Sequence, residues 1–345
     1  MSLPLEPSEA MAGDTRVPEL RSASEAADWI ECMRRGDFAA AWTLSDRILN
    51  SRAAIPCTHL PRHEQWIWNG APLQGQRVLI RCYHGLGDTI QYIRYAPLLR
   101  QIAREVYLWV QPELIPLVQH VPGLDRILPL HDGTPEIDYD ADVEIMELAH
   151  VFRTSLETIP KDIPYLIAEP AQLGPMMARL RVGIVWEAGG WDERRSVPFE
   201  LVRPLAELKG IELHALQRGV PCPREFGVDH SAADPLETAR VLSALDLLVS
   251  VDSFPAHLAG ALGRPVWTLL HSECDWRWMR QRDDSPWYPT MRLFRQSSPA
   301  DWTTVIEQLA VELQTRARGE GARPDGSGNP LWHDGGCSPG VVRVT

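Results

Sequence analysis

Short apolar runs alternate along the chain with stretches of helical periodicity. An apolar run between polar turns predicts a buried strand, and a 3.6-residue period predicts a helix. Strands are predicted at 77–82, 106–110, 126–130 and 143–146, and again at 181–186, 211–216, 247–251 and 266–270. Helices are predicted at 89–103 (interrupted at Pro97), 113–121, 201–208, 236–244 and 302–317. Because strands alternate with helices, we expect an α/β protein whose sheets are mostly parallel.

The stretch from Leu247 to Trp267 is the most informative part of this pattern. A buried strand ends at a polar turn, Pro255 stands in the first turn of a short helix, and Gly263 ends that helix before the next strand. Asp252, Ser253 and His257 therefore lie at the carboxyl end of a parallel strand. Ligands of open α/β sheets bind at that edge, and a helix start there suits a phosphate.

The two ends of the chain do not share the α/β pattern. Residues 1–22 lack periodicity, and we expect them to be disordered, as we do the Gly- and Pro-rich tail after Gly319. Residues 24–35 and 37–49 read as two helices, which resemble one tetratricopeptide-type unit. A single unit cannot bury its apolar face alone, so we expect it to pack on the rest of the protein or on another chain. A proline-containing stretch at 163–174 is the expected linker between the halves.

Composition narrows the class of protein. The 345 residues are 44% hydrophobic and 23% charged, as in soluble globular proteins, and the net charge of −12 argues against a nucleic-acid partner. The six cysteines show no metal-ligand spacing, which indicates reduced thiols. The chain shows neither a signal-peptide pattern nor an apolar run long enough to span a bilayer, so we expect a cytoplasmic protein.

A glycine loop follows the first predicted strand, in the sequence His84-Gly85-Leu86-Gly87-Asp88-Thr89. It lacks the third glycine of a dinucleotide-binding loop and the lysine of a P-loop. Gly85 and Gly87 let the backbone approach a ligand. Asp88 stands at the start of the next helix, where two roles are open: a structural N-cap, or a general base for an attacking hydroxyl.

Two further loops follow strands of the second half. In the loop 192–196, Arg194 and Arg195 could bind a diphosphate, or they could belong to a solvated charge run paired with its acidic neighbours. In the turn after residue 251, Asp252 could accept hydrogen bonds from sugar hydroxyls and Ser253 could bond phosphate. His257 either faces the same ligand or is a packed core residue.

Three long motifs, at 78–99, 182–208 and 244–266, occur in one order together with the block 275–296. They resemble the bacterial heptosyltransferase-type glycosyltransferases, and most of all the branch fused to tetratricopeptide repeats. The resemblance implies the GT-B fold, with two Rossmann-like domains facing across a cleft. It also implies inverting transfer without a metal, from a nucleoside-diphosphate sugar that is a substrate and not a cofactor.

The resemblance also assigns roles. Asp88 corresponds to the catalytic base, and Arg194 or Arg195 to a cation on the donor phosphates. The remaining donor-binding positions it suggests are Ser196, Gln217, Asp252, Ser253 and His257. The sequence departs from the family at Ser253, which replaces a threonine, at Phe254, which narrows the expected phosphate pocket, and at Glu187, whose charge opposes the donor phosphates.

The residue pattern and the resemblance together predict five parts of the chain. These are a disordered N-terminus (1–22), a helical extension (23–65), an acceptor domain (66–172), a donor-binding domain (178–317) and a disordered tail (318–345). The expected function is sugar transfer, with an ADP-heptose-like donor, to a glycan or protein hydroxyl, by a protein that can lie at the inner membrane face. Two alternatives stay open: a catalytically degenerate nucleotide-sugar-binding protein, and an interaction protein built on the helix pair.

Two acidic stretches suggest sites that we do not expect to be real. The acidic run 138–142 resembles the DxD metal motif of the other glycosyltransferase fold, but it precedes a strand of the acceptor half and reads as a solvated loop. Residues 283–286 read as a turn, because the residue before a proline is held extended, and the alternative that this turn lines the cleft stays open.

Overall fold

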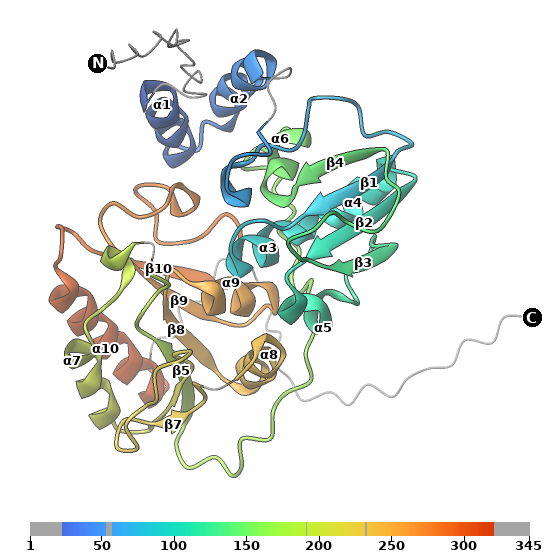
Figure 1. Ribbon diagram of the computed structural model, residues 1–345. Coiled ribbons are helices and arrows are strands. Elements are labelled where there is room, and N and C mark those ends of the chain that lie inside the picture. Colours follow the sequence, from blue (N-terminus) through green and yellow to red (C-terminus); the bar gives the residue numbers. More distant parts are fainter. Residues whose placement is uncertain (1–22, 53–56, 191, 232, 321–345) are drawn as a thin grey trace, which may run out of the picture.

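The computed structural model describes residues 23–52, 57–190, 192–231 and 233–320. Within these residues, the chain forms two α/β domains and a pair of helices beside them (Figure 1). The N-terminus predicted to be disordered, 1–22, and residues 321–345 of the tail predicted at 318–345 lie outside the described residues. The tail prediction began too early, because α10 continues to Arg318 and Gly319 caps it.

The first domain is built on a parallel sheet in the order β3-β2-β1-β4. Its strands are β1 (Arg77–Arg81), β2 (Glu105–Val110), β3 (Arg126–Pro129) and β4 (Ala141–Glu144). Its α-helices are α3 (Leu86–Tyr92), α4 (Ala96–Ile102), α5 (Ile115–Val118) and α6 (Leu148–Val151). The 3₁₀ helices of this half are η1 (Arg62–Glu64), η2 (Ile93–Tyr95), η3 (Pro112–Leu114) and η4 (Ile145–Glu147).

The second domain is built on a parallel sheet in the order β10-β9-β8-β5-β6-β7. Its strands are β5 (Leu180–Val185), β6 (Ile211–Ala215), β7 (Val228–Asp229), β8 (Leu247–Val251), β9 (Val266–Leu270) and β10 (Met291–Arg295). Its α-helices are α7 (Phe199–Val202), α8 (Pro235–Ala244), α9 (Phe254–Ala261) and α10 (Trp302–Arg318). Its 3₁₀ helices are η5 (Glu193–Arg195), η6 (Arg203–Glu207) and η7 (Trp276–Trp278). The prediction of an α/β fold with parallel sheets is confirmed.

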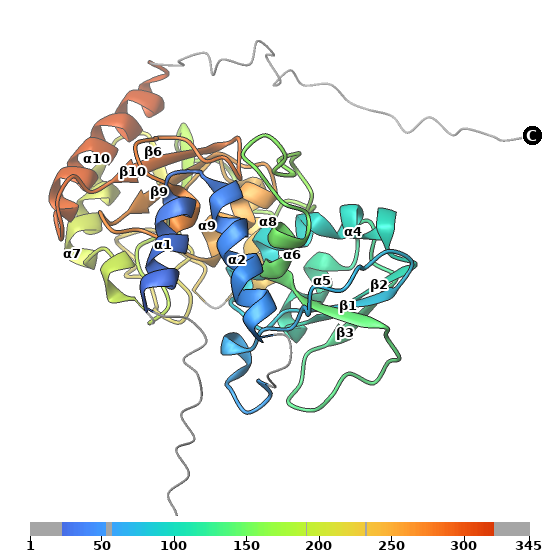
Figure 2. The same cartoon turned by 90° about the horizontal axis from the view of Figure 1, so that it is seen from above.

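Helices α1 (Ala23–Arg34) and α2 (Phe38–Arg52) lie against both domains, as Figure 2 shows from above. Trp29 of α1 packs edge-on against Trp276 of the second domain, with ring centroids 5.3 Å apart. Trp42 of α2 donates its indole N–H to the carbonyl of Thr154 in the first domain, at 2.7 Å. The pair therefore buries its apolar face on the rest of this chain, one of the two expected outcomes.

The structure corrects the prediction for the helix at 89–103. The helix begins earlier, at Leu86, and the 3₁₀ helix η2 (Ile93–Tyr95) divides it into α3 and α4. Pro97 explains the break, because it lacks an N–H and its ring crowds the carbonyl four residues earlier, that of Ile93.

Some strand predictions also need correction. The strand predicted at 143–146 lies at 141–144 and is followed by a 3₁₀ turn. β7 and β10, at the two edges of the second sheet, were not predicted. β7 has only two residues, and β10 carries arginines at Arg292 and Arg295 that break its apolar run.

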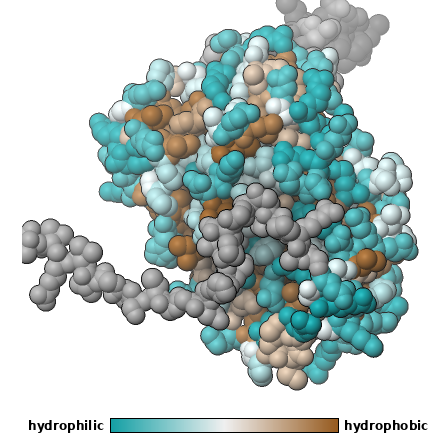
Figure 3. Space-filling model, turned by 180° about the vertical axis from the view of Figure 1, so that it is seen from behind, coloured by the Kyte–Doolittle hydropathy of each residue, from teal (hydrophilic) through white to brown (hydrophobic). Residues whose placement is uncertain are grey.

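One contiguous cluster of buried hydrophobic side chains runs through both domains and the helix pair. A smaller cluster of Leu79, Tyr107 and Trp109 covers the other face of the first sheet. The face seen from behind is largely hydrophilic, with hydrophobic residues in several small groups (Figure 3). Across the described part of the chain, no helix is both long and apolar enough to cross a bilayer.

Candidate functional site

The glycine loop places Asp88 in the first turn of α3. Gly85 is extended at φ −69° and ψ 163° and caps the helix, and its N–H donates to Oδ2 of Asp88 at 3.1 Å. Asp88 therefore stabilises the helix start from the third helical position and is not itself the N-cap. This corrects the structural alternative for Asp88, and it leaves Oδ1 available for another partner.

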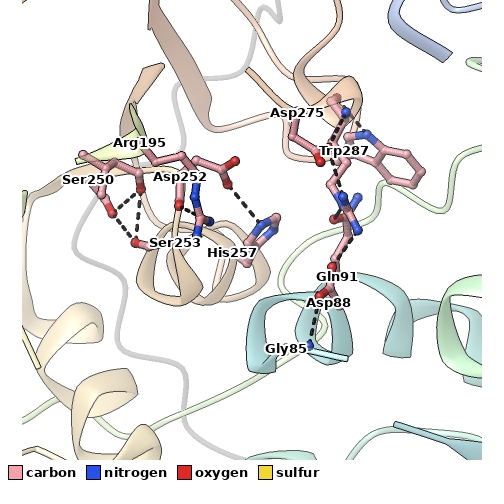
Figure 4. A network of polar contacts seen from close by, with 12 residues as sticks. Gly85, Asp88, Gln91, Arg195, Ser250, Asp252, Ser253, His257, Asp275 and Trp287 are labelled. Carbon is pink, nitrogen blue, oxygen red and sulfur yellow. Dashed lines mark hydrogen bonds and ion pairs between the residues drawn. The ribbon is translucent and has the colours of Figure 1, made fainter. Parts of the chain in front are cut away.

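That partner comes from the second domain. A guanidinium nitrogen of Arg277, in η7, donates to Oδ1 of Asp88 at 2.6 Å, and Figure 4 labels this acceptor, Asp88. The same guanidinium donates to Gln91 at 2.9 Å and to Asp275 at 2.9 Å. The side chain of Arg277 is 9% exposed and that of Asp88 is 25% exposed, so the carboxylate is held but still reaches solvent.

The glycine loop also meets α9. A Cβ atom added to Gly87 would lie 2.9 Å from Cδ2 of His257, so the absence of a side chain at Gly87 permits this approach. Nδ1 of His257 lies 3.0 Å from the hydroxyl of Tyr288, and Nε2 lies 3.8 Å from Oδ1 of Asp252. The histidine ring stacks on Trp278 with centroids 5.4 Å apart. Residues predicted from two distant motifs are thus neighbours.

Burial sets the charge of two of these groups. Burial, with nearby Asp275 adding to it, raises the pKa of Asp252 to about 6. Burial, with a smaller contribution from nearby arginines led by Arg277, lowers the pKa of His257 to about 3. At neutral pH His257 is therefore an uncharged imidazole, and Asp252 is ionised but close to its protonation point. His257 is at once the packed residue and the site neighbour that the sequence left as alternatives.

The two adjacent arginines differ in position. Arg195 donates to the backbone carbonyl of Asp252 at 3.1 Å and to that of Gly189 at 3.0 Å, so it joins the loop after β5 to the turn after β8. Arg194 pairs with Asp192 at 2.9 Å, and its side chain is 66% exposed. The solvated charge run therefore describes Arg194, whereas Arg195 lies beside the turn that carries Asp252.

The other predicted donor residues make contacts within their loops. The hydroxyl of Ser253 donates to the carbonyl of Val251 at 3.1 Å. It also lies 3.0 Å from the hydroxyl of Ser250. Because that proton is directed at the strand, the hydroxyl must rotate before it can donate to a phosphate.

Gln217 and Ser196 fix the loop that follows β5. The amide oxygen of Gln217 accepts the N–H groups of Trp186 and Glu187, at 3.1 and 2.8 Å. The hydroxyl of Ser196 accepts the N–H of Ala188 at 3.1 Å. In this structure both side chains therefore shape the loop that carries Arg195.

The departures from the family motif have defined positions. The side chain of Glu187 is exposed, and Phe254 is partly buried against the core. In the acidic run 138–142, Asp140 pairs with Arg77 and Asp142 pairs with Arg81, each at 2.7 Å. These carboxylates are thus engaged in ion pairs around β1 and β4.

The turn 283–286 takes part in an ion pair. Asp284 of the turn 283–286 pairs with Arg282 at 2.7 Å. Searched as a whole, the described residues contain no group of three or more His, Cys, Asp or Glu side chains placed to hold a metal ion.

Sequence reasoning assigned no role to Arg277, Gln91, Asp275 or Tyr288. Arg277 and Asp275 stand in the Asp-Trp-Arg-Trp block that carried part of the resemblance. The block follows β9 in the chain, and Asp275 caps η7 by accepting the N–H of Arg277 at 2.9 Å. An arginine two residues after a capping aspartate, beyond the carboxyl end of a buried strand, was the available signal.

This arrangement can perform acid–base and anion-binding chemistry. Asp88 presents a partly exposed carboxylate of fixed orientation, as a general base requires. Arg195, the start of α9 and the neutral His257 lie on the other side, in the second domain. Cations and helix starts there favour an anionic ligand.

A family model and a curated protein each match part of this chain. Residues 236–300 match the model of glycosyltransferase family 9 (heptosyltransferase), a stretch that contains Asp252, His257 and Arg277. Protein FlbA of Caulobacter vibrioides is 25% identical, over 72% of this chain and 48% of that protein. The chain thus spans about half the length of this curated relative.

Two solved structures are similar to the chain. The glycosyl transferase family 9 structure from Veillonella parvula has a TM-score of 0.51 and 11% identity, and covers 72% of this chain and 99% of that one. The E. coli ADP-heptose lps heptosyltransferase II has a TM-score of 0.49 and 14% identity, and covers 70% and 99%. The chain therefore has the fold of the Veillonella structure, the predicted GT-B arrangement of two α/β domains, and its second domain carries the family 9 match.

Proposed function

We propose that the protein is an inverting glycosyltransferase that acts without a metal ion or cofactor. It transfers a sugar from a nucleoside-diphosphate donor to a hydroxyl group of a glycan or protein. The observation that carries the proposal is the meeting of Asp88, on the first domain, with the anion-binding groups of the second. The family 9 match supports an ADP-heptose-like donor, because that family model is described as heptosyltransferase.

The proposed reaction is a single displacement. Asp88 accepts the proton of the acceptor hydroxyl while that oxygen attacks the anomeric carbon of the donor. The bond from this carbon to the phosphate oxygen breaks, and the nucleoside diphosphate leaves with the electron pair. Arg195 and the start of α9 stabilise the charge that builds on the leaving diphosphate. Because attack occurs on the face opposite to the leaving group, the configuration of the sugar inverts.

The proposal includes a place of action. We expect the protein to work in the cytoplasm, where nucleotide-sugars are made, and at the inner membrane face if its acceptor is an envelope glycan. The acidic net charge of −12 supports a carbohydrate or protein acceptor over a nucleic acid.

The test begins with binding. We expect ADP-heptose to raise the melting temperature more than UDP-glucose or GDP-mannose does, and incubation with donor to release ADP. Asp88→Asn should lower kcat by about 10²- to 10⁴-fold, since it removes the base, and leave the donor-induced shift in place. Asp284→Asn is the control, because Asp284 pairs with Arg282 and lies outside the site.

The outcomes separate the candidate functions. Equal kcat in wild type and Asp88→Asn would refute the assigned base. Binding of a nucleotide-sugar without turnover by wild type would favour the degenerate binding protein. A protein that no nucleotide-sugar stabilises would refute the proposed function.

A further inference from the structure

We propose that Arg277 is a positioning residue that orients the Asp88 carboxylate toward the acceptor hydroxyl from the opposite domain. The inference rests on the proposed function and names a part of the site that sequence motifs did not assign. It is carried by the hydrogen bonds of the Arg277 guanidinium, by the exposure of Asp88 and by the packing behind η7.

The guanidinium of Arg277 is fixed in three directions. Its nitrogens donate to Oδ1 of Asp88 at 2.6 Å, to Oε1 of Gln91 at 2.9 Å and to Oδ1 of Asp275 at 2.9 Å. Asp88 and Gln91 are three residues apart on α3, so they lie on one face of the helix. A planar guanidinium that engages both of them fixes its orientation relative to α3.

The same contacts determine how Asp88 is presented. Oδ2 is held by the N–H of Gly85 and Oδ1 by Arg277, so the carboxylate plane has two anchors. Each oxygen keeps lone-pair capacity for a further hydrogen bond. Without Arg277, the carboxylate would keep the anchor at Gly85 alone, and its broad terminal torsion would be free to turn.

The packing behind η7 holds Arg277 in place. Its guanidinium carbon lies 4.7 Å from the ring centroid of Trp276, and Trp276 packs edge-on against Trp29 of α1. Arg34, at the end of α1, donates to the carbonyl of Cys274 at 3.1 Å. The helix pair thus supports the segment that carries Arg277, which gives this N-terminal extension a part in the site.

The charges favour a role in positioning over one in stability. Arg277 lies between the carboxylates of Asp88 and Asp275, and burying such charges costs desolvation that the pairing only partly offsets. During the proposed reaction, Asp88 gains the acceptor proton and becomes neutral, while Arg277 stays protonated and keeps its pair with Asp275. The base is therefore aligned without passing a proton to the arginine.

A double-mutant cycle tests the inference. Turnover of ADP-heptose is measured for wild type, Arg277→Met, Asp88→Asn and the double variant. Arg277→Met should lower kcat on the order of 100-fold, as expected for a misplaced catalytic group, with donor KM and the donor-induced thermal shift within threefold of wild type. In the Asp88→Asn background, Arg277→Met should cause no further loss, because groups that act as a unit are not additive.

Two further variants keep the test decisive. Arg277→Lys retains the charge but not the planar fork, so it should also lose kcat, and it replaces Arg277→Met in the cycle if the methionine variant does not fold. Arg282→Met is the matched control from the same segment, since Arg282 pairs with Asp284 away from Asp88. It should keep the wild-type kcat.

Different results would overturn the role of Arg277 and the proposed function. Losses that multiply in the double variant, or a raised donor KM with unchanged kcat, overturn the positioning role and make Arg277 a separate ligand of the donor. A kcat of Arg277→Met equal to that of wild type overturns the inference alone. Absence of turnover by wild type with every nucleotide-sugar overturns the proposed function, and this role of Arg277 with it.

Discussion

Among the described residues, two buried arginines reach across the boundary between the domains, and their partners differ. Arg94, from the first domain, donates to the carbonyl of Trp287 at 2.6 Å and to the hydroxyl of Tyr165 at 2.7 Å, among other neutral acceptors. Arg277, from the second domain, donates to the carboxylates of Asp88 and Asp275. The two residues are almost equally buried, at 4% and 8% exposure, so burial does not separate them.

The difference in partners indicates that Arg94 holds the two domains together and that Arg277 forms part of the site. The carbonyl of Trp287, in the second domain, keeps its buried cationic donor only while the domains stay together, which makes this contact of Arg94 structural. A carboxylate that is a quarter exposed and bonded to a buried cation is oriented and still open to substrate. We therefore expect Arg94 to govern stability and Arg277 to govern turnover.

Removing Arg94 is the change with the largest expected effect on stability. Arg94→Met should lower the free energy of unfolding by about 4 kcal/mol, because the buried acceptors at Trp287 and Tyr165 lose a charged donor. Urea denaturation measures this. The kcat of the folded fraction should stay within threefold of wild type, and Arg100→Met, at an exposed ion pair, should change stability by less than about 0.5 kcal/mol. If Arg94→Met lost as much kcat as Arg277→Met, the two arginines would not differ in their effect on turnover.

Gly87 tests how closely the two domains approach at the site. Gly87→Ala should cost about 2 kcal/mol, because the new Cβ would lie 2.9 Å from the buried ring of His257. It should also lower kcat by moving Asp88 relative to η7. Gly190→Ala is the control, since no atom lies within 4 Å of its added Cβ. Wild-type stability and kcat in Gly87→Ala would mean that the contact between α3 and α9 yields easily.

His257 gives the same boundary a pH dependence. Its pKa is about 3 in the folded protein, because of burial first and nearby arginines second, against 6.5 when unfolded. Between these values the unfolded state binds the proton, so stability from this group is complete above pH 6.5 and is lost as the pH falls. From pH 6.5 to 5 the loss should be about 2 kcal/mol.

The comparison with His257→Gln isolates this contribution. Other buried histidines, such as His214, also have lowered pKa values through burial, so wild type alone would combine their contributions. Urea unfolding of both proteins at pH 5 and 6.5 gives the difference. An identical pH dependence of the two proteins would contradict the neutral, buried state of His257.

These contrasts show what the sequence could and could not predict. β8 and β9 were predicted with their observed ends, because buried parallel strands are continuous apolar runs closed by a polar turn or a proline. Asp88, Asp252 and His257 were identified because each lies in the turn or the first helical turn that follows a strand. Arg277 was not, because it meets Asp88 across 189 residues of chain and no local pattern reports that contact. The choice between Arg194 and Arg195 likewise depends on a tertiary contact, with the carbonyl of Asp252.

Substitution of Arg34 tests whether the helix pair contributes to stability alone or also to turnover. Arg34→Met should lower stability by about 1 kcal/mol, because the carbonyl of Cys274 loses its hydrogen bond. If the helix pair supports Arg277, kcat should fall severalfold in the same variant. Arg35→Met, at the exposed neighbouring position, should change neither quantity. A loss of stability with wild-type kcat would mean that the helix pair, like Arg94, contributes to stability and not to turnover.

The smallest expected effect belongs to Arg194. The side chain of Arg194 is 66% exposed although that of Asp192 is 11% exposed, so Arg194→Ala should change stability by less than about 1 kcal/mol, and the donor affinity from thermal-shift titration should stay within twofold. Arg195→Ala removes the bridge to the carbonyl of Asp252 and should weaken donor binding about tenfold, the value of one charge-assisted hydrogen bond. Equal losses in the two variants would mean that the donor recruits Arg194 from solvent. The position of an arginine in this structure would then not predict which cation binds the donor.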